Sequence, residues 1–170
     1  IPLILFSYYN PLFVVGTQEI TQRAKEAGVD GLLVVDLPYE EADELKKYTD
    51  HADLDLIFLL APTSNDTRIK MISQKARGFL YYVSMTGVTG STRSEGQYVE
   101  EDIRRIKKYT DLPIAIGFGI STPNQAQTMG KCADGVVVGS AIVRIIEQHR
   151  NSPQLLKKVG EFVAQLRRVL

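Results

Sequence analysis

The sequence has little of what membrane, secreted or nucleic-acid-binding proteins need. Its one cysteine, Cys132, allows no internal disulfide and has no companion metal ligands, so we predict no metal site and a cytoplasmic address. Basic and acidic residues balance at 20 each, with no basic stripe that could neutralise a nucleic acid backbone. No apolar run is long enough to span a bilayer. The expected partners therefore include neither nucleic acid nor a membrane.

What the sequence does have is the composition of an ordinary folded domain. Apolar residues make up 44% of the 170 residues and charged residues 24%. We therefore expect residues 1–170 to form a single domain.

Six short apolar runs recur along the chain, each bounded by turn residues. They are continuous rather than alternating, which is typical of parallel strands covered on both faces. Segments with helical spacing of apolar residues separate them, so the order is strand and helix, repeated. The runs lie at residues 3–8, 32–36, 56–60, 79–84, 114–117 and 136–138.

Helix starts are marked by a hydroxyl residue before a proline. Thr122-Pro123 predicts the start of one helix, and Ser152-Pro153 predicts the start of the last. The final strand is thus followed by two helical segments, at residues 141–150 and 153–170.

Two glycine segments follow the last two strands, and each opens into a helix: Gly117-Phe118-Gly119-Ile120-Ser121 and Gly139-Ser140-Ala141-Ile142. Unpaired N–H groups at a helix start, with the positive end of the helix dipole, bind an oxyanion without lysine. Two such junctions near the chain end match the phosphate site of a (β/α)8 barrel. The sequence therefore predicts a TIM barrel that acts on a phosphorylated small molecule.

An open doubly wound sheet would also repeat strand and helix, but its glycine fingerprint belongs in the first strand-to-helix turn. That turn is Ser7-Tyr8-Tyr9-Asn10-Pro11 here, without glycine. A whole barrel needs about 250 residues. We therefore expect six of the eight βα units, strands 3 to 8, in this chain.

In motif order and spacing the chain resembles the alpha subunit family of tryptophan synthase over nearly all its residues. The motifs that carry the resemblance are Ser7-Tyr8-Tyr9-Asn10-Pro11, Ala27-Gly28-Val29-Asp30-Gly31, Asp36-Leu37-Pro38, Gly87-Val88-Thr89-Gly90, Gly117-Phe118-Gly119-Ile120-Ser121 and Val138-Gly139-Ser140-Ala141-Ile142-Val143.

The resemblance implies a lyase of tryptophan biosynthesis, which cleaves indole-3-glycerol phosphate to indole and glyceraldehyde 3-phosphate. It also implies a beta subunit as partner, in an alpha2beta2 heterotetramer, with pyridoxal phosphate in the beta subunit and no cofactor in this one. Carbon–carbon cleavage needs positioned carboxylates as general acid and base. In the family these are a Glu and an Asp that we expect upstream of Ile1, so no catalytic residue is assigned here. The 170-residue chain alone is predicted to be inactive, with Tyr81 and Thr89 as supporting residues.

The resemblance assigns the substrate phosphate to Gly90, Gly119, Gly139 and Ser140. A glycine after a strand is by itself often only a tight turn, but three strand-end loops carry one here. Ser140 could equally serve to cap its helix, because serine is a preferred N-cap.

The remaining site residues are aromatic, aliphatic or polar. Phe6, Leu59 and Phe118 match the indole pocket, although apolar residues inside a barrel often only pack. Tyr8 and Asp36 match polar support at the barrel mouth, and Asp36 could equally be a turn residue.

Two other functions stay open at this point. The protein could be a non-catalytic activator of a beta subunit, or another phosphate-binding barrel enzyme such as a sugar-phosphate isomerase.

Overall fold

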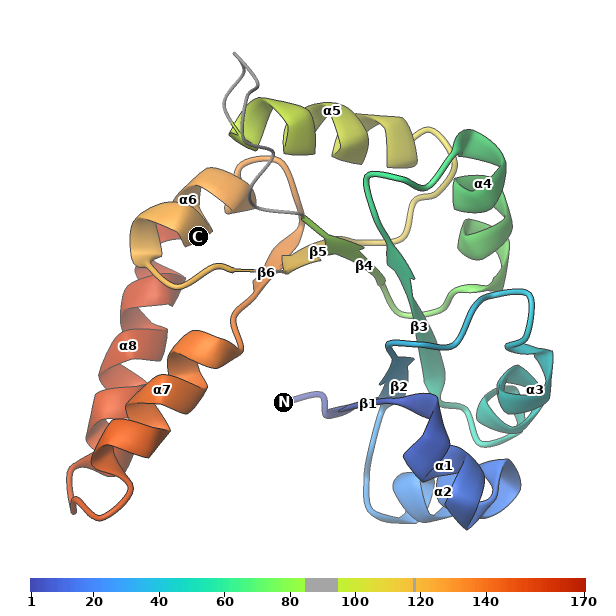
Figure 1. The fold of residues 1–170 in the computed structure, drawn as a ribbon, viewed down its shortest axis with the longest axis horizontal. Coiled ribbons are helices and arrows are strands. Elements are labelled where there is room, and N and C mark those ends of the chain that lie inside the picture. The colour runs from blue at the N-terminus through green and yellow to red at the C-terminus, as the bar shows by residue number, and fades with distance from the viewer. Residues whose placement is uncertain (85–94, 118) are drawn as a thin grey trace. The chain divides into compact units, whose positions relative to one another are not determined.

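The computed structural model describes residues 1–84, 95–117 and 119–170. In these ranges six strands and eight helices alternate, which confirms the predicted α/β architecture (Figure 1). No helix there is long and apolar enough to cross a membrane. The contacts group into two compact units, Ile1–Tyr81 with Tyr109–Leu112, and Tyr82–Lys108 with Pro113–Leu170. Strand β4 (Leu80–Val83) contains the division between them.

The first unit holds three parallel strands whose order follows the chain. The register pairs Phe6 with Leu33, and Leu33 with Ile57, so these three side chains point to the same face. Both faces of β2 are buried, as its continuous apolar sequence predicts. The elements are β1 (Ile4–Ser7), α1 (Tyr9–Val15), α2 (Thr17–Glu26), β2 (Gly31–Val34), α3 (Asp43–His51), β3 (Asp55–Leu60) and α4 (Asp66–Lys75).

Helix α1 was not expected, since the sequence around Pro11 reads as a loop. The helix begins at Tyr9 because the Asp36 carboxylate accepts its main-chain N–H at 2.7 Å. This capping group lies 27 residues away in the chain. Local sequence therefore gives no sign of it.

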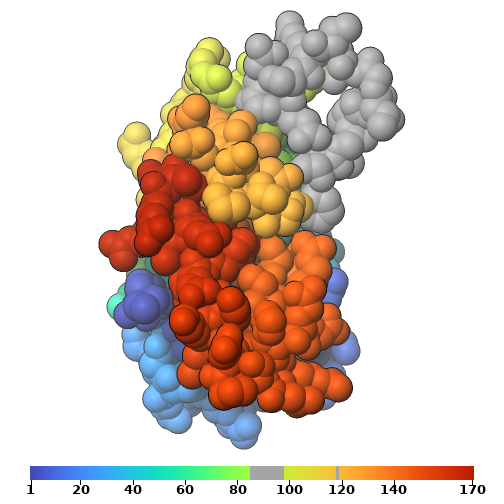
Figure 2. All heavy atoms as spheres, turned by 90° about the vertical axis from the view of Figure 1, so that its left-hand side faces the viewer, coloured from blue at the N-terminus to red at the C-terminus, as the bar shows by residue number. Residues whose placement is uncertain are grey.

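The second unit holds the parallel pair β5 and β6 and four helices. Helix α8 packs against both α6 and α7. Figure 2 shows α7 and α8 side by side. Their exposed apolar residues include Val143, Ile146, Leu156 and Val163. The elements are α5 (Glu95–Ile106), β5 (Ile114–Gly117), α6 (Pro123–Gly130), β6 (Gly135–Val137), α7 (Ser140–His149) and α8 (Leu155–Val169).

The two proline-marked helix starts have different outcomes. Helix α6 begins at Pro123 with Thr122 as its N-cap, as predicted. The prediction for Ser152-Pro153 is wrong by two residues, because α8 begins at Leu155. The Ser152 hydroxyl instead accepts the N–H of Gln154 at 3.2 Å, within the turn that joins α7 to α8.

The same Asp-Gly motif appears in both units, at the start of a strand. In the first, Asp30 precedes β2, and its carboxylate accepts the N–H of Leu3 at 2.7 Å while its own N–H donates to the Leu3 carbonyl. In the second, Asp134 precedes β6 and makes the same two bonds with Ile114, at 2.8 and 2.9 Å. Each aspartate thereby fixes the register of its strand on the preceding one.

The glycines after these aspartates differ in their surroundings. A Cβ on Gly31 would lie 2.8 Å from the Asp55 carbonyl oxygen, with Ile4 and Ile57 also within 3.1 Å. A Cβ on Gly135 would come no closer than 3.9 Å to a described atom, the Cβ of Ala115. Of these two positions, position 31 alone requires glycine for packing.

We predict that Gly31→Ala lowers the free energy of unfolding by about 1–3 kcal/mol, because main chain cannot yield to the added methyl. Gly135→Ala, the same change at the equivalent position, should shift it by no more than about 1 kcal/mol. Urea unfolding of the two variants measures both values. Equal losses would show that the close approach at Gly31 does not decide its identity.

The Asp134 carboxylate also predicts a pH dependence. The Lys107 ammonium at 2.6 Å, and then the Ile114 N–H, hold the pKa of Asp134 below its ordinary value of 3.8. This stabilisation is complete above the unfolded-state pKa and is lost as pH falls through the folded-state pKa. The stability advantage of wild type over Asp134→Asn should therefore shrink below about pH 4.

Urea unfolding between pH 3 and pH 7 tests this prediction. Asp111→Asn is the control, since this carboxylate has no ion pair with a described residue. An advantage over Asp134→Asn that is constant across this range would contradict it.

Candidate phosphate site and strand-end residues

The β5–β6 register determines where the two glycine loops begin. Gly117, the last residue of β5, pairs with Val137, the last of β6. Gly119 and Gly139 each lie two residues beyond these partners. Because the strands are parallel, both loops leave the sheet at the same edge. The Ser84 N–H donates to the Gly117 carbonyl at 3.1 Å, so β4 ends at this edge too.

Helix α7 has no side-chain cap at its N-terminus. Gly139 is the N-cap, and Ser140 is the first helical residue rather than the cap that the sequence left possible. The Ser140 side chain is exposed, and its hydroxyl bonds to no residue in the part of the chain that the structure describes. The first N–H groups of α7 and this hydroxyl are thus available to an anion.

The described residues around Gly139 give no reason why this position must be glycine. Its φ is −109°, and an added Cβ would meet no described atom within 4 Å. Neither a left-handed conformation nor packing therefore demands glycine here. The space beside this backbone is therefore open to a ligand.

Gly119 has a different reason to be glycine, since its φ is +74°. The next residue, Ile120, is buried. Beyond it, Thr122 and Gln125 form a capping box that occupies the start of α6. The two neighbouring helix starts are thus unlike, with α6 capped by its own side chains and α7 open.

In the first unit, Tyr81 packs on Phe6. The ring centroids are 6.1 Å apart in an edge-on arrangement, and burial raises the pKa of Tyr81. The next residue, Tyr82, is also buried, but its hydroxyl donates to Asp102 of α5, and burial followed by this bond raises its pKa. The two tyrosines thus point to opposite faces, as strand alternation predicts.

Leu59 shares a face with Phe6. It lies two residues after Ile57, whose register partner Leu33 pairs with Phe6. Leu59 also lines a cavity of about 200 Å³ beyond the carboxyl ends of β2 and β3, together with Asp36. Three of the predicted site residues of this unit, Phe6, Leu59 and Tyr81, thus share one face or contact each other.

Asp36 is exposed and holds the start of α1 through the Tyr9 N–H. It is therefore more than a turn residue, because it links the loop after β2 to the loop after β1. Tyr8 is the N-cap residue of α1, and its side chain is 62% exposed.

Sequence reasoning missed the contact that holds the loop after β2. The ring of Tyr39 lies beneath two cations of α4, with Arg68 at 5.0 Å and Lys75 at 5.9 Å from its centroid. Lys75 also donates to the Tyr39 carbonyl at 3.0 Å. A lone tyrosine in a loop gives no sequence signal for such a contact.

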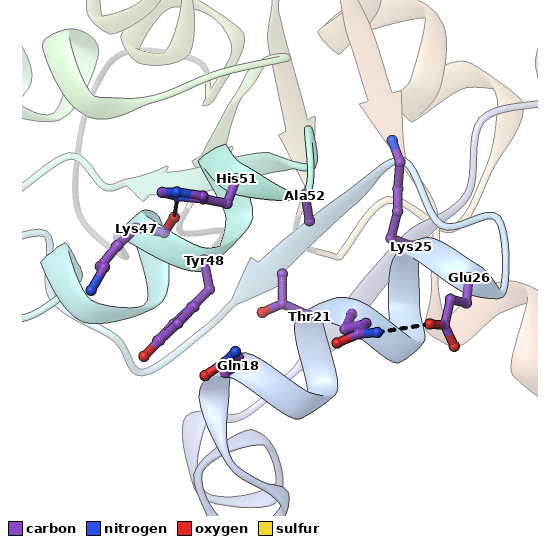
Figure 3. Close-up of a pocket in the computed structure, with 9 residues that line it drawn as sticks. Gln18, Thr21, Lys25, Glu26, Lys47, Tyr48, His51 and Ala52 are labelled. Carbon is purple, nitrogen blue, oxygen red and sulfur yellow. Dashed lines mark hydrogen bonds between the residues drawn. The ribbon is translucent and has the colours of Figure 1, made fainter.

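A larger groove, of about 620 Å³, lies between α2 and α3 (Figure 3). None of the predicted site residues lines it. Ligands of parallel α/β proteins bind at the carboxyl ends of the strands, whereas this groove is formed by α2, α3 and Ala52, the residue that follows α3. It is therefore not the candidate site. Its lining residues are Gln18, Thr21, Gln22, Lys25, Glu26, Lys47, Tyr48, His51 and Ala52.

Three predicted residues, Thr89, Gly90 and Phe118, lie outside the described residues. Within the described ranges, no group of three or more His, Cys, Asp or Glu side chains could hold a metal ion.

Known proteins match the chain along its whole length. A family model described as tryptophan synthase alpha chain matches residues 1–169. The tryptophan synthase alpha chain of Geotalea uraniireducens (strain Rf4) is 49% identical over 167 residues, which cover 98% of this chain and 62% of that protein. That of Methanocaldococcus jannaschii is 43% identical, covering 95% and 58%.

Solved structures agree with these matches. Tryptophan synthase subunit alpha from Campylobacter jejuni has a TM-score of 0.87 at 34% identity, and covers 95% of this chain and 64% of its own. The Legionella pneumophila subunit also has a TM-score of 0.87, at 36% identity, covering 99% and 62%.

The chain thus spans about three fifths of the length of the relatives that it matches. The structural matches confirm the α/β TIM-barrel class. By the family model and by these relatives, the chain belongs to the tryptophan synthase alpha chain family.

Proposed function

We propose that this chain is part of an alpha subunit that cleaves indole-3-glycerol phosphate to indole and glyceraldehyde 3-phosphate in tryptophan biosynthesis. The observation that carries the proposal is the open start of α7, beside the Gly119 loop, in a member of this family. A sugar-phosphate isomerase would also use such a site, but family membership favours the lyase.

The phosphate binds through hydrogen bonds from main chain and one hydroxyl. The Ser140 N–H and hydroxyl donate to phosphate oxygens at the positive end of the α7 dipole. Gly139 leaves room for the anion, and Gly119 donates from the neighbouring loop. Gly90 is proposed as a further main-chain donor. Hydrogen bonds to a charged group stabilise more than neutral ones, which lets such a site work without lysine.

The strand-end residues of the first unit have separate roles. Phe6 and Leu59 border the indole ring, with Phe118 as a third apolar contact. Tyr81, held edge-on against Phe6, supports the reaction centre, as does Thr89. Tyr8 and Asp36 provide polar support at the carboxyl ends of β1 and β2.

The acid–base chemistry lies outside these 170 residues. Cleavage requires a proton at indole C3 and removal of a proton from a glycerol hydroxyl, which is work for positioned carboxylates. We assign it to a Glu and an Asp of a preceding segment, so that this chain forms the C-terminal part of the protein, from the third strand onward. The chain's share of its relatives' length, about three fifths, supports this assignment.

The proposed partner is a tryptophan synthase beta subunit in an alpha2beta2 complex. A Pyrococcus furiosus relative, 32% identical to this chain, was solved as a tryptophan synthase complex. Pyridoxal phosphate belongs to the beta subunit in this proposal, and the alpha subunit holds no cofactor. A cytoplasmic location agrees with the single cysteine.

We predict that Gly139→Ala weakens binding of glycerol 3-phosphate at least tenfold, because the methyl group takes the space of the anion. The free energy of unfolding should not fall, since no described atom lies near the added Cβ. Titration followed by amide NMR, with urea unfolding in parallel, measures both quantities.

Gly160→Ala is the matched control, because its Cβ would also meet no described atom within 4 Å but lies within α8. It should leave phosphate binding unchanged. Glycerol without phosphate should leave the Gly139 and Ser140 amides unperturbed. Full-strength binding by Gly139→Ala would refute the site.

The proposal also predicts that the 170-residue chain alone releases no indole from indole-3-glycerol phosphate and binds glycerol 3-phosphate only weakly. Indole release, followed by absorbance, measures the first property. Turnover by this chain would show that the acid and base lie within it. A full-length relative serves as the positive control.

A further inference from the structure

We propose that Gln125 is a positioning residue for the phosphate loop, which holds residues 119–122 so that Gly119 offers its N–H to the anion. This inference rests on the proposed phosphate site at Gly119, Gly139 and Ser140. It adds a residue that does not touch the ligand but decides which amides reach it.

The side-chain oxygen of Gln125 collects four donors. The main-chain N–H groups of Ser121 and Thr122 approach it at 2.9 and 3.1 Å. The hydroxyls of the same two residues lie at 3.1 and 3.3 Å. In return, the Gln125 N–H donates to the Thr122 hydroxyl at 3.3 Å, which closes the capping box.

Because of these hydrogen bonds, the N–H groups just before α6 are not available to a ligand. The N–H groups of Ser121 and Thr122, which immediately precede α6, are already satisfied by Gln125, and the Gln125 N–H is satisfied by the Thr122 hydroxyl. The corresponding groups of α7 have no side-chain cap. The anion is thereby directed to α7, and the β5 loop contributes through Gly119 alone.

The turn between β5 and α6 is held from two sides. The Ile120 side chain is 4% exposed and anchors the turn in the core. Gln125 binds the next two residues from the helix. Gly119, with φ of +74°, lies two residues after the end of β5 and directly before Ile120. If the Gln125 acceptor is lost, the turn can relax and Gly119 loses its fixed direction.

Two substitutions distinguish the positioning role of the Gln125 acceptor from the packing of its side chain. Gln125→Leu keeps the size of the side chain and removes the acceptor. Gln125→Glu keeps the acceptor, because glutamate also completes a capping box, but adds a negative charge. Gln127→Leu is the matched control, on the same helix and exposed, with no hydrogen bond to a described residue.

The test follows the amides of Gly119 and Ser140 by NMR while glycerol 3-phosphate is added to the 170-residue chain. In Gln125→Leu the Gly119 response should be lost, the Ser140 response should remain, and the Kd should rise about fivefold or more. Gln127→Leu should behave as wild type. In Gln125→Glu the Gly119 response should remain, with weaker binding that recovers in part at high salt.

Unchanged Gly119 response and affinity in Gln125→Leu would overturn the assignment, because a merely structural cap would lower stability without affecting that one amide. Should this variant fail to fold, loss of the Gly119 response in Gln125→Glu would overturn it equally. Absence of any response at Ser140 in the wild-type chain is a different result, which overturns the phosphate site itself.

Discussion

The register between β5 and β6 is the constraint on which the candidate site depends. Asp134 sets it, since its carboxylate and its own N–H both bond to the main chain of Ile114. In a parallel pair, a register fixed at the amino ends also fixes where the strands end. Gly117 and Val137 are therefore partners, and the loops after them leave at one edge. A charged side chain at the opposite end of the strands thus aligns the two glycine loops.

The same device at Asp30 shows that the fold is built from a repeated unit rather than from unique contacts. Asp30 bonds to Leu3 as Asp134 bonds to Ile114, although the surrounding residues differ. What differs is the space beside the following glycine. Gly31 is pressed against the main chain of Asp55, whereas Gly135 has room. In this Asp-Gly motif the aspartate therefore has the same hydrogen-bonding role at both sites, whereas the packing around the glycine differs.

The sequence predicted all six strands because short, continuous apolar runs between helical segments are typical of strands in a parallel sheet. Helix α1 could not be found the same way, since the group that caps it, Asp36, is close only after folding. Thr122-Pro123 predicted the start of α6, but only the structure shows that Gln125 closes a capping box with Thr122 and also binds Ser121. For Ser140, the sequence permitted two roles. The structure decided against the cap, because the helix begins one residue earlier than capping by serine requires.

The contrast between α6 and α7 shows how stability and binding are divided between two adjacent helix starts. A side-chain cap stabilises a helix by about 1 kcal/mol, and α6 has one. Helix α7 has none, so its first amides keep their hydrogen-bonding capacity for a ligand. In the proposed function, a phosphate bound there would supply the missing cap, and binding to the folded chain alone would also stabilise that chain. The proposed site therefore predicts that the free energy of phosphate binding adds to the free energy of folding at the helix start that has no side-chain cap.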